Sequence, residues 1–149
     1  MLASATEHFL RDAGIVSGMR VLDIGCGMGD VTMLVAQLVG AQGRVTSIDL
    51  DQASIATARK RAAAVGLDNT TFHRVDISTF TDIEPFDAIV GRLVLEFLPD
   101  PAATIRRLCG LLVVRYENSV APARPEPTTD QEREQWRAPS DRPEPPLRG

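Results

Sequence analysis

The chain has 149 residues, which is room for one domain of ordinary size. Its formal net charge is −4 at pH 7 and Lys60 is its single lysine, which argues against a nucleic-acid-binding surface. Met1 to Leu10 lack the apolar run of a signal peptide, and no stretch approaches the roughly 20 apolar residues of a membrane span. Two cysteines are too few for a disulfide framework, which favours a reducing, cytoplasmic location. From the charge and the lack of a long apolar stretch, we also expect no nucleic-acid or membrane partner.

Helical and strand patterns alternate along the chain. Apolar residues at helical spacing predict helices over residues 4–13, 30–39, 52–65 and 101–112. Short apolar runs predict strands over residues 19–24, 44–48, 70–75 and 86–90, with residues 113–116 as one further candidate. This alternation predicts an α/β fold with a parallel sheet and helices on both faces, in which ligands bind at the carboxyl ends of the strands.

Acidic residues stand at the starts of the predicted helices. Asp30 and Asp51 are in position to cap the second and third helices, and Asp100 precedes a fourth helix that begins with Pro101. Gly40 follows the second helix, where a left-handed cap is common.

Residues 21–30 join a short apolar strand to a glycine-rich turn and the start of a helix. Gly25, Gly27 and Gly29 occupy alternate positions, and Asp23 lies just before them. Dinucleotide-binding loops follow G-x-G-x-x-G, and this chain has an acid where that pattern has its third glycine. An acid before the turn disfavours a diphosphate and suits a cationic amine. An NAD(P)-dependent oxidoreductase is therefore an alternative that both the spacing and Asp23 argue against.

Two further acids, Asp49 and Asp76, follow the second and third predicted strands. A carboxylate after the second strand can accept both hydrogen bonds of a ribose diol. Each acid also has a purely structural interpretation. Asp49 could cap the following helix, although Asp51 is better placed for that role. Asp76 could be a solvated residue at a strand end, and Asp23 could cap the N–H groups of the loop itself. Because parallel strands end at one edge, we expect the three acids to lie at the same edge of the sheet.

These segments resemble the motifs of class I S-adenosylmethionine-dependent methyltransferases. Residues 21–30 are similar to the family's first motif, residues 45–49 to its ribose motif and residues 74–77 to its third motif. The resemblance implies a doubly wound, mostly parallel sheet of the Rossmann-like methyltransferase type. It also implies S-adenosyl-L-methionine as cofactor and methyl transfer to a small-molecule acceptor.

By the same resemblance, Asp23 faces the methionine ammonium, Asp49 the ribose hydroxyls and Asp76 the adenine amino group, while the backbone N–H after Asp76 reaches a ring nitrogen. The cofactor-binding residues that it implies are Asp23, Gly25, Cys26, Gly27, Asp49, Leu50, Asp76, Ile77 and Arg92.

No residue stands out as a catalytic base. Many small-molecule members of the family carry His where this chain has Phe97, so the catalytic residues stay unassigned. Cys26 fits a small apolar residue in the loop better than a nucleophile. No His or Cys has metal-ligand neighbours at a useful spacing, and we expect no metal.

The resemblance covers roughly residues 19–112, after which the family's usual turn and later strands have no counterpart. We therefore expect residues 1–116 to form an S-adenosylmethionine-binding domain that is truncated at its C-terminal side. Residues 117–149 hold seven of the ten prolines and few large apolar residues, which predicts a disordered tail. An incomplete sheet leaves two alternatives open: an inactive cofactor-binding remnant or assembly partner, and a homo-oligomer or partner chain that covers the sheet.

Overall fold

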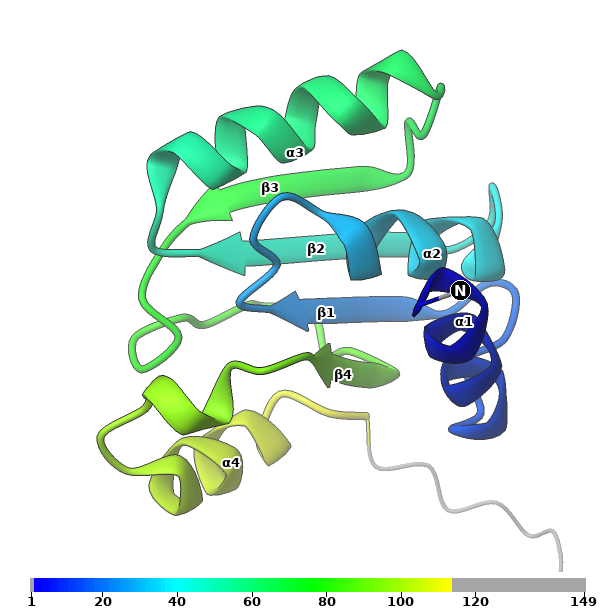
Figure 1. The fold of residues 1–149 in the computed structure, drawn as a ribbon. Coiled ribbons are helices and arrows are strands. Elements are labelled where there is room, and N and C mark those ends of the chain that lie inside the picture. The colour runs from blue at the N-terminus through cyan, green and yellow to red at the C-terminus, as the bar shows by residue number, and fades with distance from the viewer. Residues whose placement is uncertain (1, 114–149) are drawn as a thin grey trace, which may run out of the picture. The chain divides into compact units, whose positions relative to one another are not determined.

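The computed structural model describes residues 2–113, with side chains from residue 5 onward. Its helices are α1 (Leu2–Asp12), α2 (Asp30–Val39), α3 (Gln52–Ala64) and α4 (Pro101–Cys109), and its strands are β1 (Arg20–Ile24), β2 (Arg44–Asp49), β3 (Thr70–Arg74) and β4 (Ala88–Gly91) (Figure 1). The strands form one parallel sheet in the order β3-β2-β1-β4, which confirms the predicted fold class. No helix in this described range is long and apolar enough to cross a membrane.

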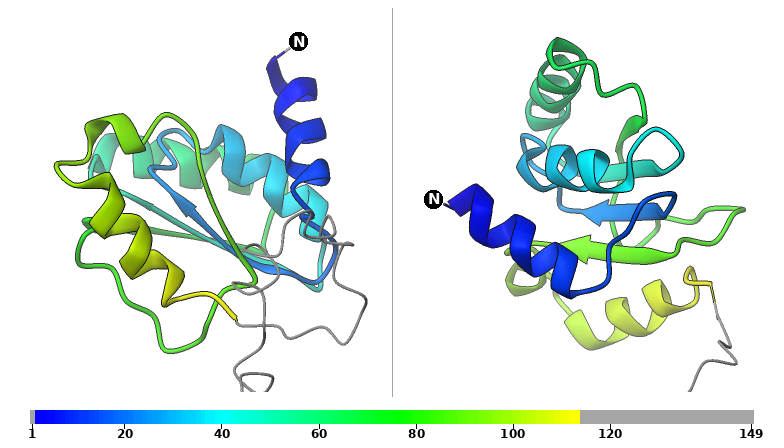
Figure 2. Two further views of the ribbon diagram at one scale, coloured as in Figure 1. Left: turned by 90° about the horizontal axis from the view of Figure 1, so that it is seen from below. Right: turned by 90° about the vertical axis from the view of Figure 1, so that its right-hand side faces the viewer.

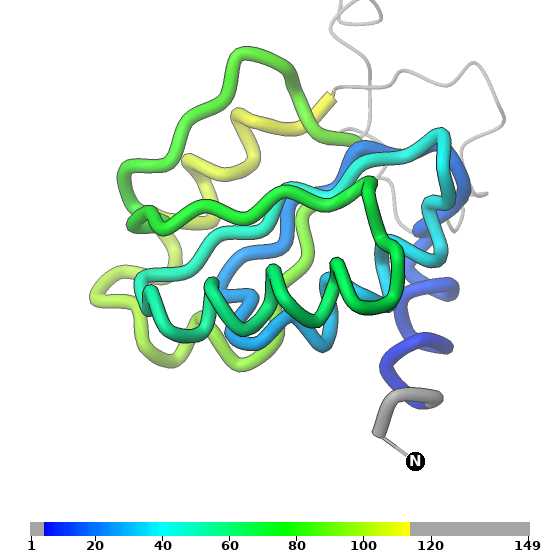
Figure 3. The backbone as a smooth tube through the Cα atoms, turned by 90° about the horizontal axis from the view of Figure 1, so that it is seen from above, coloured from blue at the N-terminus to red at the C-terminus, as the bar shows by residue number. Residues whose placement is uncertain are grey.

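Other elements of the chain cover both faces of the sheet (Figure 2), and each face buries apolar side chains. One face carries α1, α2 and α3, whose buried residues pack against Val21, Val45 and Phe72. The other face carries α4 and the connection between β3 and β4, which lie side by side in Figure 3. This second layer buries Leu22, Ile24, Ile48, Ile77, Phe80, Phe86 and Leu108. Helices on both faces are what the alternating pattern predicts.

The boundaries of the strand predicted over residues 86–90 and of the helix predicted over residues 101–112 are wrong by two or three residues. Strand β4 begins at Ala88, because Phe86 instead forms a separate parallel bridge with Leu112. Phe86 N donates to Leu111 O at 2.8 Å, and Val113 N donates to Phe86 O at 2.8 Å. The chain therefore leaves the helix after Cys109 and comes to lie beside β4 on the edge away from β1. The rest of the predicted strand 113–116 and the predicted tail lie outside the described residues.

The predicted helix caps have mixed outcomes. Asp51 and Asp100 cap α3 and α4, as predicted: the two carboxylate oxygens of Asp51 accept the N–H groups of Ala53 and Ser54, and Asp100 Oδ1 accepts the N–H of Ala103. The cap predicted at Asp30 is wrong, because Gly29 occupies the N-cap position with φ 86° and Asp30 is already helical. The Asp30 carboxylate pairs instead with Arg61 at 2.8 Å.

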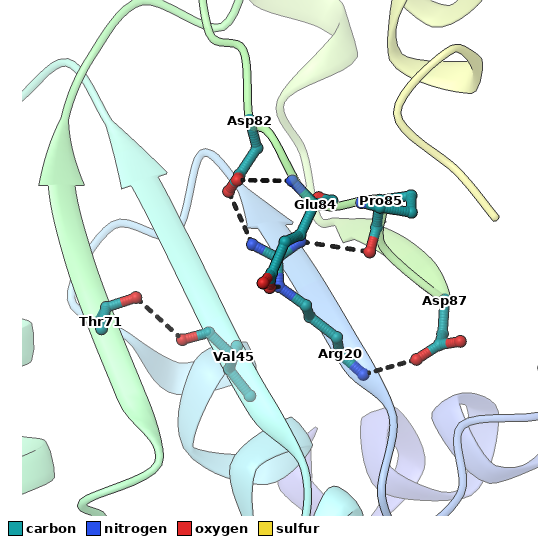
Figure 4. Close-up of polar contacts among 7 residues, drawn as sticks. All are labelled: Arg20, Val45, Thr71, Asp82, Glu84, Pro85 and Asp87. Atoms are coloured by element: carbon teal, nitrogen blue, oxygen red, sulfur yellow. Dashed lines mark hydrogen bonds and ion pairs between the residues drawn. The ribbon is translucent and has the colours of Figure 1, made fainter.

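The connection between β3 and β4 crosses the sheet face without forming a helix, and Arg20 of β1 holds it in place (Figure 4). The Arg20 guanidinium pairs with Asp82 at 2.7 Å, donates to the carbonyl oxygens of Glu84 and Pro85, and lies 4.0 Å from the centre of the Phe86 ring. Its backbone N–H donates to the Asp87 carboxylate at 2.8 Å. One arginine thus fixes the whole end of the connection.

An open hollow of about 1130 Å³ lies beside this connection. Its wall includes Arg20, Thr46, Thr71 and His73, which lie on the sheet face opposite α2 and α3. The glycine loop is not among its lining residues, so the hollow is distinct from the predicted cofactor site at the carboxyl edge.

We expect Arg20→Met to lower the free energy of unfolding by about 2 kcal/mol, because it removes several half-buried hydrogen bonds and a cation–π contact together. The matched control is Arg44→Met, since Arg44 is the parallel neighbour of Arg20 on β2 and its side chain is exposed. Urea unfolding followed by circular dichroism measures both variants. Equal losses in the two variants would contradict the role given to Arg20.

Candidate functional site

The carboxyl ends of β1, β2 and β3 meet at one edge of the sheet, where each is followed by a predicted site segment (Figure 1). The parallel register places Asp23 beside Ser47 and Asp49 beside Arg74. The glycine loop follows β1, Asp49 ends β2, and Asp76 lies two residues beyond β3. The structure therefore brings these segments to the edge where ligands bind in such sheets.

Strand β2 holds the glycine loop through its last two residues. The backbone N–H groups of Gly25 and Cys26 both donate to Ile48 O, at 2.9 and 3.0 Å. The N–H of Gly27 donates to Asp49 Oδ2 at 2.8 Å. These three bonds fix the path of the loop across the end of the neighbouring strand.

Glycine is required at two points of this loop for different reasons. A Cβ on Gly25 would lie 2.6 Å from a methyl group of Val94, so there is no room for a side chain. Gly27 has φ 53°, a left-handed conformation that L side chains rarely adopt, and a Cβ there would meet no atom of the described residues within 4 Å. The backbone at Gly27 is thus open on the side that a side chain would cover, which lets a ligand approach closely.

Asp23 is buried, with 1% of its surface exposed. Its Oδ2 accepts the hydroxyl of Thr32 on α2 at 2.6 Å, and that hydroxyl lies 2.9 Å from Ser47 Oγ on β2. Burial raises the pKa of Asp23 to about 7, although the Thr32 hydrogen bond and the charge of Arg92 act against the rise. Asp23 therefore ties β1, α2 and β2 together directly under the loop.

Asp49 is half-buried, and both of its carboxylate oxygens accept backbone N–H groups. Oδ2 takes Gly27 N, and Oδ1 takes Asp51 N at 2.9 Å. Asp51 caps α3, so the helix-cap role considered as an alternative for Asp49 belongs to Asp51 instead. Each oxygen of Asp49 keeps a second lone pair for a further donor. Leu50, which comes next, exposes 61% of its surface beside this carboxylate.

Asp76 and Ile77 begin a tight turn after β3. Asp76 Oδ1 accepts both the N–H and the hydroxyl of Ser78 at 2.7 Å, and these bonds hold the pKa of Asp76 below its ordinary value. Within the described chain, Asp76 Oδ2 accepts no hydrogen bond and the Ile77 N–H donates none. An ionised acceptor and a backbone donor thus lie on consecutive residues.

The predicted residue Arg92 follows β4 and lies near the start of α2. Its Nη2 is 3.8 Å from Asp30 Oδ2, and Arg61 of α3 binds the other oxygen of the same carboxylate. Arg92 also lines a hollow of about 450 Å³ between α1 and β4, whose other lining residues are mostly apolar, Phe9 and Val90 among them. This cation therefore lies between the loop and a space that is largely apolar.

Cys26 has the properties of a small apolar residue. It is 7% exposed, and burial, together with the charges of Asp23 and Asp49, raises the pKa of its thiol to about 12. The thiol therefore stays protonated at neutral pH and is a poor nucleophile. Within the described residues, no cluster of His, Cys, Asp and Glu could hold a metal ion.

Several residues that shape this site are not singled out by the sequence motifs. Val94 packs over Gly25, Thr32 binds Asp23, and Arg61 donates to Met28 O of the loop at 2.7 Å. Thr32 carries a usable signal, because it is a polar residue on a helix face that is otherwise apolar. Val94 and Arg61 act across long sequence separations and have no local signal.

The residues present fit S-adenosylmethionine by their chemistry. The unpaired Asp76 Oδ2 and Ile77 N–H match the amino group and ring nitrogen of adenine, and the Asp49 carboxylate can accept from a ribose diol. The uncovered backbone at Gly27 leaves room for a ligand beside that carboxylate.

The sequence matches the family described as "Methyltransferase domain" over residues 15–133. Since this match covers well over half of the chain, the protein belongs to the methyltransferase domain family. The match runs past residue 116, the last residue of the domain that we predict, so the boundary between domain and tail stays a prediction.

Among curated proteins, the chain is similar to aklanonic acid methyltransferase DauC of Streptomyces sp. (strain C5), with 39% identity over 98 residues, 65% of this chain and 44% of the relative. It is 31% identical over 108 residues to the ubiquinone biosynthesis O-methyltransferase of Nitrosococcus oceani, covering 71% of this chain and 44% of the relative. The chain thus spans less than half the length of these two relatives.

Solved structures confirm the Rossmann-like methyltransferase fold. Coclaurine N-methyltransferase bound to N-methylheliamine and SAH matches with a TM-score of 0.68 and 24% identity, over 74% of this chain and 32% of that chain. A SAM-dependent methyltransferase from Aquifex aeolicus matches with a TM-score of 0.65 and 24% identity, over 72% and 57%. The [4+2]-cyclase SpnF matches with a TM-score of 0.66 and 27% identity, over 74% and 40%.

The raised pKa of Asp23 predicts how stability depends on pH. Between the ordinary value of 3.8 and the folded value of about 7, the folded protein holds a proton that the unfolded chain releases, so stability falls as pH rises through this range. Asp23→Asn keeps an oxygen for the Thr32 hydroxyl and cannot ionise. We expect its unfolding free energy, relative to the unsubstituted chain, to rise by about 1 kcal/mol per pH unit across that window.

Urea unfolding of both proteins at closely spaced pH values measures this difference. A difference that stays constant from acid to neutral pH would contradict the buried, protonated state of Asp23.

Proposed function

We propose that this chain binds S-adenosylmethionine at the carboxyl edge of its sheet and transfers the methyl group to a small-molecule acceptor. The family and the methyltransferase relatives indicate this cofactor. The observation that carries the proposal is the Asp49 carboxylate, which binds the glycine loop while its remaining lone pairs stay available beside the open backbone at Gly27.

In this proposal, Asp49 receives the ribose hydroxyls and Leu50 provides an apolar surface beside them. Asp76 accepts from the adenine amino group through Oδ2, and the Ile77 N–H donates to a ring nitrogen. The support for these roles is that both groups are unpaired within the described residues and that the lowered pKa of Asp76 keeps it ionised.

The methionine end of the cofactor is assigned to the loop and its flanks. Gly25, Cys26 and Gly27 supply the backbone along which it lies, and Arg92 attracts the carboxylate. Asp23, whose pKa of about 7 lets a cation beside it favour the ionised form, attracts the ammonium group from below. The supporting facts are the burial of Asp23 beneath the loop and the position of Arg92 near the N-terminus of α2, which no side chain of the described residues caps. A helix N-terminus favours an anion.

S-adenosylmethionine supplies, when bound, a methyl group that its positive sulfur already activates. The chain's residues then have to hold donor and acceptor in line and keep water away. The acceptor class is proposed as a small organic molecule, because relatives are named for aklanonic acid, ubiquinone biosynthesis and trans-aconitate. No residue is assigned as a base.

The experiment is calorimetric titration of the chain with S-adenosylmethionine, beside Asp49→Ala and Asp51→Ala. We expect Asp49→Ala to weaken binding at least tenfold, since a charge-assisted acceptor and an anchor of the loop are lost together. Asp51→Ala is the matched control, because it removes the α3 cap two residues away and lowers stability without touching the ligand.

Absence of binding by the folded chain would overturn the proposal. Binding weakened equally by the two variants would remove Asp49 from the site.

Tighter binding of NADH than of S-adenosylmethionine would favour the oxidoreductase. Binding without transfer of a radiolabelled methyl group to a panel of carboxylic acids and phenols would favour the inactive remnant. The likeness to SpnF shows that this fold also carries a protein named for another reaction.

A further inference from the structure

The turn that begins at Asp76 is closed by its own hydrogen bonds. The N–H groups of Thr79 and Phe80 both donate to Asp76 O, at 3.1 and 3.0 Å, and Ser78 N donates to the Asp76 side chain. A turn of this size leaves other carbonyl oxygens without partners inside it. Those of Ile77 and Phe80 accept no backbone hydrogen bond within the described residues, so side-chain donors decide how firmly the turn is held.

Both carbonyl oxygens are bound by one side chain from another part of the chain. Arg107 of α4 donates through Nη1 to Phe80 O at 2.6 Å and through Nη2 to Ile77 O. The Ile77 and Phe80 side chains pack beneath the turn in one cluster with Leu108, the residue after Arg107. Helix α4 therefore holds the turn both by side-chain packing and by two hydrogen bonds from one guanidinium group.

The peptide groups held by Arg107 adjoin the two groups proposed to read adenine. The Ile77 carbonyl belongs to the same residue as the unpaired Ile77 N–H, and the Asp76 carboxylate precedes it. Arg107 also contributes, after the Ser78 hydrogen bonds, to the lowered pKa of Asp76. Fixing two carbonyl oxygens restricts the rotation of this backbone before a ligand arrives, which reduces the entropy lost on binding.

We propose that Arg107 is a positioning residue for purine recognition: by holding the carbonyl oxygens of Ile77 and Phe80, it aligns Asp76 Oδ2 and the Ile77 N–H with the amino edge of adenine. This inference rests on the proposed function. It differs from a general bracing role, because a brace affects binding of any cofactor analogue equally, whereas aligned adenine contacts distinguish a 6-amino purine from a 6-oxo purine.

The test compares S-adenosylhomocysteine with S-inosylhomocysteine, which has an oxygen in place of the amino group. Calorimetry gives the ratio of the two dissociation constants for the unsubstituted chain, Arg107→Met and Arg106→Met. Arg106 is the matched control, because it is an exposed arginine on the same helix with no hydrogen bond or ion pair among the described residues.

We expect the unsubstituted chain and Arg106→Met to prefer the adenine ligand by roughly tenfold to a hundredfold, the usual effect of a mismatched hydrogen-bonding group. Arg107→Met should bring this ratio close to one. Asp49→Ala should weaken both ligands by the same factor and keep the ratio.

An Arg107→Met protein that binds both ligands more weakly but keeps the preference would overturn the inference and leave the proposed function intact. Failure of the unsubstituted chain to bind either ligand would overturn both. Circular dichroism checks that each variant is folded. If Arg107→Met does not fold, Arg107→Lys, which can donate to one carbonyl, replaces it: an intermediate ratio supports the inference and an unchanged ratio overturns it.

Discussion

The hydrogen bonds between the end of β2 and the glycine loop are the interaction on which the site depends. Ile48 O accepts two N–H groups and Asp49 accepts a third, so the loop cannot move independently of the second strand. The left-handed backbone at Gly27 is held in this way, with its open side toward solvent. Removing the Asp49 carboxylate would therefore change both the shape of the loop and the chemistry beside it.

Short-range patterns in the sequence predict most of this fold. Parallel strands, helix starts and the caps at Asp51 and Asp100 follow from spacing and side-chain chemistry within a few residues. The errors lie where distant segments decide. Phe86 leaves β4 because the chain after α4 pairs with it, and Asp30 gives up the cap because Gly29 turns left-handed and Arg61 takes the carboxylate.

The candidate site divides in the same way. The positions of Asp23, Asp49 and Asp76 at one edge are predictable, because the carboxyl ends of parallel strands meet there. The residues that contact these acids and the loop are harder to predict. Thr32 lies nine residues from Asp23 and is marked in the sequence only as a polar residue on an apolar helix face, whereas Val94 and Arg61 reach the loop from remote segments. A motif thus gives the acceptors of a site and omits the groups that orient them.

The two faces of the sheet support different halves of the site. On the face covered by α2 and α3, the loop, Asp23 and Asp49 are joined by contacts among neighbouring elements of the first half of the fold. On the opposite face, the turn at Asp76 depends on Arg107, and the connection after it depends on Arg20. Since this connection forms no helix, its backbone groups need external donors, and two arginines supply them. The part of the proposed site that would bind adenine therefore depends on α4, although the sequence motif for adenine binding ends at residue 77. Substitutions in α4 that remove the Arg107 hydrogen bonds should therefore alter the turn at Asp76.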